Sequence, residues 1–298
     1  MSVERIHTDT LDIAYVRLGR AGATPVVLLH GFPYDIHAWD AIAPVLADRG
    51  CDVIVPWLRG FGPTRFRHDH TPRSGQQAAL AHDLLGLLDA LGLDSALLAG
   101  YDWGGRAACI VAALQPQRVS GLVTGNGHNI QNIASAGEPA APDDERRYWY
   151  QYYFHSERGR RGLSQNRERL CALLWHEWSP RWTFDEACFA RSAAAFHNPD
   201  FVPVVIHSYR HRYGLEPGDP ALEPMEQAIA RYIADQGTIS VPTISLDGTA
   251  DGVLTADGAQ RHDHFFSGPY QYRQITDAGH NLPQEKPAAV LQAIVNLL

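Results

Sequence analysis

The chain has 298 residues, of which 45% are hydrophobic and 19% charged, enough for one large α/β domain or a domain with an insertion. Its net charge of −8 and its mixture of signs argue against a nucleic acid as partner. The first residues lack the apolar segment of a signal peptide. No apolar run reaches the ~18 residues that a membrane-spanning helix needs. We therefore expect a cytoplasmic protein that does not span a membrane. Four singly spaced cysteines are typical of reduced, buried thiols.

Strand-like and helix-like segments alternate over the first 125 residues. An early segment at 11–18 alternates in polarity, as a half-exposed strand does. Continuous apolar runs, typical of strands buried in a parallel sheet, follow at residues 25–30, 52–56, 95–99 and 119–125. Helical spacing separates these runs at about residues 39–50, 75–91 and 106–115. The alternation predicts an α/β fold with a doubly wound, mostly parallel sheet.

The alternation stops between residues 130 and 238, where the chain is rich in arginine, tryptophan and tyrosine. Candidate helices in this segment cover residues 143–154, 165–177, 185–196, 201–213 and 224–235. The strand pattern resumes at 239–246, and a last strand near 270–275 precedes a terminal helix from 287. We predict a core at 1–129 and 239–298 with an inserted helical cap, or lid, at 130–238. An insertion at this place covers the carboxyl ends of the strands.

A turn flanked by glycines, Gly100-Tyr101-Asp102-Trp103-Gly104, joins the run at 95–99 to the next helix. This is the context of a G-x-S-x-G nucleophile elbow, with Asp102 in place of the serine. A carboxylate needs no base to become anionic, and its attack on a saturated carbon gives an alkyl ester that activated water can cleave. The pattern therefore predicts displacement at carbon by Asp102. The alternative is an ordinary turn in which Asp102 caps the helix.

An acid and a histidine follow the elbow, each in a loop after a predicted strand. Asp251 follows the strand that ends at 246, and His280 follows the last strand, in the order nucleophile, acid, base. His280 would activate water, and Asp251 would fix its tautomer. Asp247 is the competing acid, and a plain surface histidine is the alternative for His280. From position alone, the backbone N–H groups of Phe32 and Trp103 are expected to form an oxyanion hole.

Several short segments along the chain together carry a resemblance to a known family. They are His30-Gly31-Phe32-Pro33, Arg59-Gly60-Phe61-Gly62, Asp102-Trp103-Gly104-Gly105, Asp251 and Gly279-His280. In this combination the chain resembles the α/β-hydrolase fold family, and within it the epoxide hydrolase branch, which is close to the haloalkane and fluoroacetate dehalogenases. The resemblance implies a cofactor-independent hydrolase without a metal, acting on a small epoxide or alkyl halide and water. An aromatic cap suggests that the substrate is apolar. A homodimer is left open.

The resemblance also implies two cap tyrosines that hydrogen-bond and protonate the epoxide oxygen. Tyr150 and Tyr209 lie in matching Tyr-Gln and Tyr-Arg segments. The alternative is that such tyrosines only pack the cap. The register of the first is open, because three more tyrosines lie beside it, at Tyr148, Tyr152 and Tyr153. Substrate contacts are expected from Phe32, Trp103, Gln151 and Trp175.

Halide release from an alkyl halide is the second hypothesis from the sequence. Haloalkane dehalogenases hold the halide with the tryptophan after the nucleophile, here Trp103, and with an asparagine, where this chain has Phe32, or a cap tryptophan. Fluoroacetate dehalogenases use an arginine where this chain has Trp103, and Arg106 corresponds only to their second arginine. From the sequence, a substrate that carries a carboxylate is therefore left open but disfavoured. The cap tyrosines favour an epoxide hydrolase over a dehalogenase. A ligand-binding receptor without catalysis is the third hypothesis.

Overall fold

The computed structural model describes residues 2–254 and 259–298, and its centre is a nine-stranded sheet. The strands lie in the order β1-β2-β4-β3-β6-β7-β8-β9, and β5 pairs with β2 beside this path. The pairs from β4 to β9 are parallel, and the pairs that involve β2 are antiparallel. The bounds are β1 (Val3–His7), β2 (Leu11–Gly19), β3 (Thr24–Leu29), β4 (Cys51–Pro56), β5 (Arg65–Phe66), β6 (Ala96–Gly100), β7 (Val119–Gly125), β8 (Thr243–Gly248) and β9 (Tyr270–Ile275).

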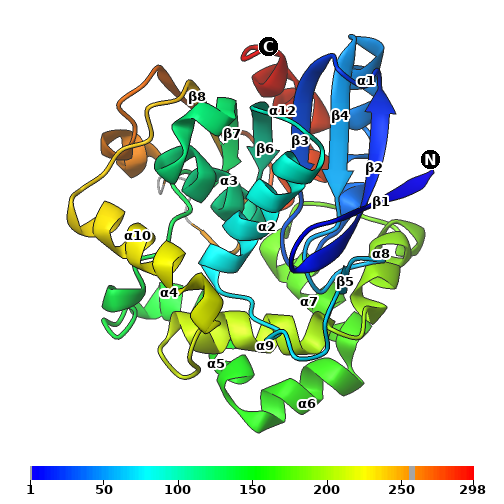
Figure 1. Ribbon diagram of the computed structural model, residues 1–298. Helices are drawn as coiled ribbons and strands as arrows, with labels where there is room; N and C mark the ends of the chain where they lie inside the picture. The colour runs from blue at the N-terminus through cyan, green and yellow to red at the C-terminus, as the bar shows by residue number, and fades with distance from the viewer. Residues whose placement is uncertain (1, 255–258) are drawn as a thin grey trace.

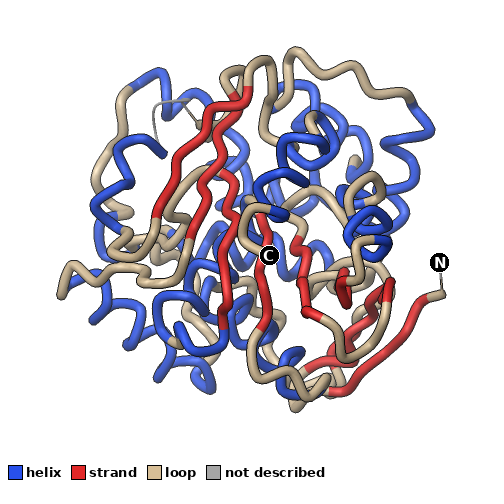
Figure 2. Tube along the Cα trace, turned by 90° about the horizontal axis from the view of Figure 1, so that it is seen from above, coloured by secondary structure: helices blue, strands red, loops and turns tan. Residues whose placement is uncertain are grey.

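Helices cover both sides of this sheet, as Figure 2 shows from above. Every residue of β4 and β6 is buried, because side chains on both faces of these strands meet helices. The core helices are α1 (Ala43–Asp48), α2 (Gln77–Ala90), α3 (Asp102–Leu114), α11 (Leu282–Glu285) and α12 (Pro287–Val295). Short 3₁₀ segments are η1 (Ile36–Trp39), η2 (Pro116–Arg118) and η6 (Ala259–Phe265). The predicted doubly wound α/β fold is therefore confirmed.

Between β7 and β8 the chain forms a group of helices that lie together beyond one end of the sheet (Figure 1). They are η3 (Ile133–Ser135), α4 (Pro142–Arg147), α5 (Trp149–His155), α6 (Glu157–Gln165), α7 (Arg167–Trp178), α8 (Glu186–Ala193), η4 (Ala194–His197), α9 (Phe201–Arg212), η5 (Pro220–Leu222) and α10 (Glu223–Ala234). Helix α5 contacts α6 and α9, whereas α10 contacts the core helices α2 and α3. The last helix of the predicted cap thus lies against the core, and the domain boundaries stay a prediction.

Local differences from the expected elements have identifiable causes. The helix expected at 143–154 is divided into α4 and α5, with Tyr148 between them. The unexpected α6 begins where the Ser156 side chain accepts a hydrogen bond from the Gly159 N–H. The strand expected at 239–246 begins only at Thr243, because Pro242 has no N–H to donate to a sheet.

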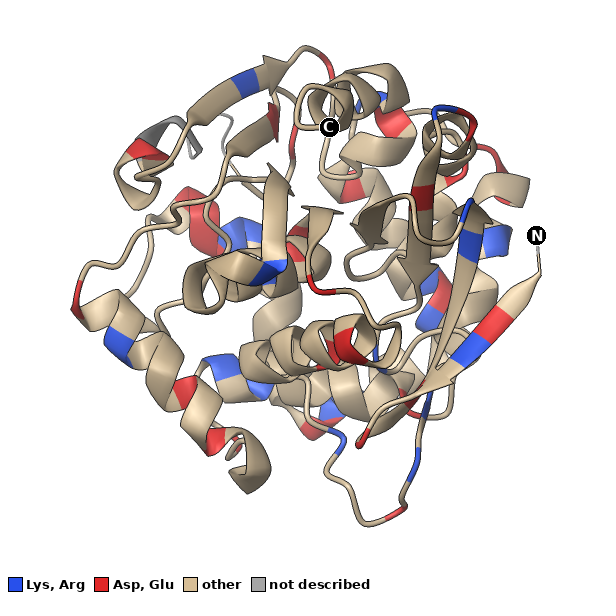
Figure 3. Ribbon diagram, turned by 45° about the horizontal axis from the view of Figure 1, so that its top comes forward, with Lys and Arg blue, Asp and Glu red and all other residues tan. Residues whose placement is uncertain are grey.

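Charged residues of both signs are interspersed over the helices and strands (Figure 3). This agrees with the mixed-sign sequence pattern. In the described parts of the chain, the helices are all too short or too polar to cross a membrane.

The elbow packs so closely on strand β3 that one glycine has no room for a side chain. A Cβ on Gly104 would lie 2.4 Å from the Leu29 carbonyl oxygen and 2.6 Å from that of His30. We predict that Gly104→Ala lowers the free energy of unfolding by about 1–3 kcal/mol, as overpacked cores do. Gly137→Ala is the matched control, since a Cβ there meets nothing within 4 Å. Equal stability of both variants in urea denaturation would contradict this packing.

Candidate active site

Asp102 is the first residue of α3, directly after the turn that ends β6. Its φ of 50° is in the left-handed region, which is uncommon for a residue other than glycine and is typical of a strained functional turn. The carboxylate Oδ1 accepts a hydrogen bond from the Phe32 N–H at 2.7 Å, and no N–H of α3 is its partner in the described chain. Asp102 therefore does not act as a simple helix cap.

His280 lies between two carboxylates and is almost completely buried. Its Nδ1 is 2.8 Å from Asp251 Oδ2, and its Nε2 is 3.6 Å from Asp102 Oδ2. Asp251 is itself fixed, because its Oδ1 accepts from the N–H groups of Val253 (2.7 Å) and Leu254 (3.0 Å). The side-chain amide of Asn126 also donates to Asp251 Oδ2 at 3.0 Å. The predicted nucleophile, base and acid thus meet in one site.

Asp247, the competing candidate for the acid, is not hydrogen-bonded to His280 in the described structure. Asp247 is within β8 and accepts a hydrogen bond from the Tyr272 hydroxyl at 3.4 Å. Asp251, four residues further on, is the carboxylate that holds His280. The position of the two side chains therefore supports Asp251 as the orienting acid.

Neighbouring charges set the protonation of His280 and of Asp102. Burial alone lowers the pKa of His280, but the charges of Asp251 and Asp102 and the hydrogen bonds to them outweigh it and raise the pKa to about 10. Burial raises the pKa of Asp102, yet its hydrogen bond and charge interaction with His280, with help from Arg106, bring the pKa below the usual 3.8. At neutral pH, Asp102 is therefore an anion beside an imidazolium.

Two cap tyrosines complete the site from α5 and α9. The rings of Tyr150 and Tyr209 lie 5.4 Å apart and nearly perpendicular, and both side chains are buried. Burial, above all, raises the pKa of both phenols above the usual 10, so each keeps its proton. The Gln151 amide donates to the Tyr150 oxygen at 3.1 Å. Both phenols can therefore serve as proton donors.

The positions of the neighbouring tyrosines help to decide which tyrosine of this segment is the first proton donor. Tyr152 is exposed, and its hydroxyl hydrogen-bonds Glu145. The Tyr153 hydroxyl would meet a Cβ at Gly162, so it is packed against α6. Tyr148 lines the nearby cavity but is only half-buried. Among these four, Tyr150 is the tyrosine whose ring contacts Tyr209.

The other predicted contacts divide into two groups. Phe32 and Trp103 are fully buried and stacked at 5.6 Å beside the nucleophile, and Gln151 lines the cavity. Trp175 is placed elsewhere: its indole N–H donates to the Pro33 carbonyl at 2.8 Å, and its ring stacks on Trp182. These contacts pack the cap on the loop after β3, and a substrate contact of Trp175 stays a prediction.

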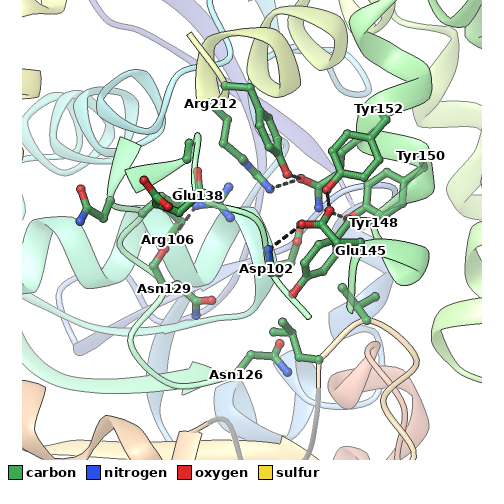
Figure 4. A pocket seen from close by; sticks show the side chains of 18 of the residues that line it. Asp102, Arg106, Asn126, Asn129, Glu138, Glu145, Tyr148, Tyr150, Tyr152 and Arg212 are labelled. Carbon is green, nitrogen blue, oxygen red and sulfur yellow. Dashed lines mark hydrogen bonds between the residues drawn. The ribbon is translucent and has the colours of Figure 1, made fainter. Parts of the chain in front are cut away.

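A cavity of about 800 Å³ opens beside Asp102 (Figure 4). Asp102, His280 and Tyr150 form one part of its wall, and the segment 126–132 forms another. Arg106 and Arg212 also line it. This lining is more polar than the apolar pocket that the aromatic cap suggested. No cluster of metal-ligating side chains occurs within the described residues.

Glu285 in α11 is a functional residue that the sequence did not reveal. Its two carboxylate oxygens accept from the N–H groups of Gly279 (2.6 Å) and Asn281 (2.9 Å), on either side of His280. The Ser179 hydroxyl, at the end of α7, donates to it at 2.7 Å. Glu285 thus positions the histidine loop and ties it to the cap. Because its loop partners are backbone N–H groups, no side-chain pattern could indicate this role.

Comparisons with known proteins agree with this fold. The family described as alpha/beta hydrolase fold matches residues 24–287, so the chain belongs to the α/β-hydrolase fold family. Epoxide hydrolase A of Mycobacterium tuberculosis is 27% identical over 98% of this chain and 96% of its own. The crystal structure of a candidate epoxide hydrolase from Klebsiella pneumoniae has 43% identity and a TM-score of 0.96, covering 99% of this chain and 97% of that one. Epoxide hydrolase B of M. tuberculosis is 34% identical over 45% of this chain and 40% of its own.

The charge on Asp251 is expected to hold the proton on His280. We predict that Asp251→Asn lowers the pKa of His280 from about 10 toward its usual 6.5, as followed by NMR titration of the imidazole. A histidine with a raised folded-state pKa stabilises the protein below pH 6.5 and loses this contribution as the pH rises through 10. The wild type should therefore lose more stability than Asp251→Asn between these pH values. Identical pH slopes would disprove the coupling.

Proposed function

We propose that this protein is an epoxide hydrolase that opens its substrate through an ester on Asp102. One geometric observation carries the proposal. Asp102 Oδ2 lies 3.6 Å from His280 Nε2, Tyr150 lines the same cavity as Asp102, and the Tyr209 ring lies 5.4 Å from the Tyr150 ring. A strained oxygen leaving group needs a proton donor, and a halide does not. The names of the relatives support the same activity. A cytoplasmic location and a homodimer stay predictions.

In the first step, Asp102 Oδ2 attacks a ring carbon, because Oδ1 is held by the Phe32 N–H. The carbon–oxygen bond breaks, and the ring oxygen takes a proton from Tyr150 or Tyr209. This leaves a neutral ester, a tyrosinate and the His280 imidazolium. With the Asp102 charge gone, the pKa of His280 falls, and the imidazolium transfers its proton to the tyrosinate, which becomes a phenol again.

In the second step, neutral His280 takes a proton from a water that attacks the ester carbonyl carbon. The charge that develops on Oδ1 is stabilised by the Phe32 N–H, and the Trp103 N–H is the proposed second donor. Collapse of this intermediate releases the vicinal diol, whose second hydroxyl proton comes from the water. The site returns to carboxylate, imidazolium and phenol, so protons balance over the cycle.

Halide release is the second candidate because of one specific feature. The buried indole N–H of Trp103, beside the nucleophile, has no hydrogen-bond partner within the described chain. Such a donor suits a halide ion. The paired tyrosines are unexplained by this candidate, which is why we rank it second.

Diol formation from a panel of aliphatic and aryl epoxides tests the proposal. We expect Asp102→Asn to abolish diol, and Tyr150→Phe and Tyr209→Phe each to slow ester formation by about 10²-fold, as loss of a general acid does. Tyr153→Phe is the matched control, since this phenol packs against α6. Diol that persists in Asp102→Asn, or halide release without any diol formation, would refute the proposal.

A further inference from the structure

Two helices each carry a reacting group and, one turn further along, an arginine. Arg106 follows Asp102 by four residues on α3, and Arg212 follows Tyr209 by three at the end of α9. Residues three or four apart lie on the same face of a helix. Both arginines accordingly line the same cavity as Asp102, and Figure 4 shows their side chains directed into it from two sides.

Arg106 is a buried cation with little to balance it. It is only 7% exposed, and its one hydrogen bond within the described residues runs from Nε to the Asn129 carbonyl at 3.3 Å. Arg59, which is also buried, instead binds Asp83 with two bonds of 2.6 Å. Burial, followed by the nearby charge of Arg212, lowers the pKa of Arg106 to about 10. A buried guanidinium normally has a carboxylate partner, as Arg59 has in Asp83.

Arg212 is similarly short of partners. Its Nη1 donates to the neutral Gln151 side chain at 3.1 Å, and its guanidinium lies over the Tyr209 ring at 4.9 Å. Its Nε is buried without a partner in the described residues. Within residues 2–254 and 259–298, neither Arg106 nor Arg212 forms an ion pair with an Asp or Glu.

The carboxylates around the cavity do not provide a lasting buried counter-charge for the two arginines. Asp102 attracts Arg106, but it becomes a neutral ester during the reaction. Glu138 is exposed to solvent, where its charge is screened. Glu145 is engaged by the Ala140 N–H and the Tyr152 hydroxyl. Once Asp102 is alkylated, the two guanidinium groups face the substrate without a buried counter-charge.

We propose that Arg106 and Arg212 form an anion subsite, and that the substrate is an epoxide that carries a carboxylate. This inference rests on the proposed epoxide hydrolysis. Guanidinium groups suit a carboxylate because their N–H donors match its two oxygens. Arg106 lies one helical turn from Asp102, Arg212 lies over the Tyr209 ring, and both arginines line the cavity beside the nucleophile, so we place the carboxylate close to the epoxide ring. The substrate class is therefore short epoxy acids.

A matched pair of substrates tests the subsite: a short epoxy acid and its primary amide, which differs mainly in charge. In the wild type we expect kcat/KM for the acid to exceed that for the amide by about tenfold or more, the range of a charge-assisted contact. Arg106→Gln and Arg212→Gln should each reduce this ratio about tenfold, mainly through KM. Arg118→Gln is the control, because Arg118 pairs with Asp89 and is absent from the described cavity lining.

A binding measurement separates this inference from the proposed function. Sodium butanoate, which has no epoxide, should bind Asp102→Asn protein in calorimetry, and adding Arg106→Gln should weaken this binding at least about tenfold. Such binding without diol from any epoxide would overturn the hydrolase proposal and keep the subsite. Equal kcat/KM for acid and amide, with both arginine variants slowing the two substrates alike through kcat, would overturn the subsite.

Discussion

The turn that holds Asp102 between β6 and α3 is the constraint on which the site depends. The close approach of Gly104 to the Leu29 carbonyl fixes the start of α3 against the end of β3. This approach brings the Phe32 N–H to Asp102 Oδ1, at 2.7 Å, and leaves Oδ2 facing His280. In the proposed mechanism, Oδ1 therefore carries the charge that the Phe32 N–H stabilises, and Oδ2 attacks the substrate. The chemistry of both steps follows from this division.

The cap contributes more than proton donors, because it also holds the loops that carry the base and the acid. The Trp178 carbonyl, at the end of α7, accepts from the His280 N–H at 3.1 Å and from the Gly252 N–H at 3.0 Å. Next to it, Ser179 binds Glu285, which secures both neighbours of His280. Movement of the cap would therefore disturb the position of the catalytic base as well as the two tyrosines. In the proposed mechanism, core and cap therefore act together.

The sequence predicted what depends on local spacing, and the structure supplied what depends on folding. The parallel sheet and Asp102, Asp251 and His280 follow from apolar runs and from residues placed just after strands. For Trp175 the sequence could not decide between substrate contact and packing of the cap, because a tryptophan in an aromatic cap gives the same pattern in both cases. The sequence also could not show that Arg106, among the described residues, has a backbone carbonyl and no carboxylate as its hydrogen-bond partner. Such features depend on contacts between distant segments.

The central claim is that the substrate passes through a covalent ester on Asp102, and a single turnover in water labelled with ¹⁸O tests it most directly. With enzyme in excess over epoxide, the attacking water oxygen should remain on the Asp102 carboxylate, while the diol receives an unlabelled oxygen from Asp102. Mass spectrometry of the peptide that contains Asp102 and of the diol measures both. Label in the diol, with none in Asp102, would mean that water attacks the ring directly, and it would contradict the account.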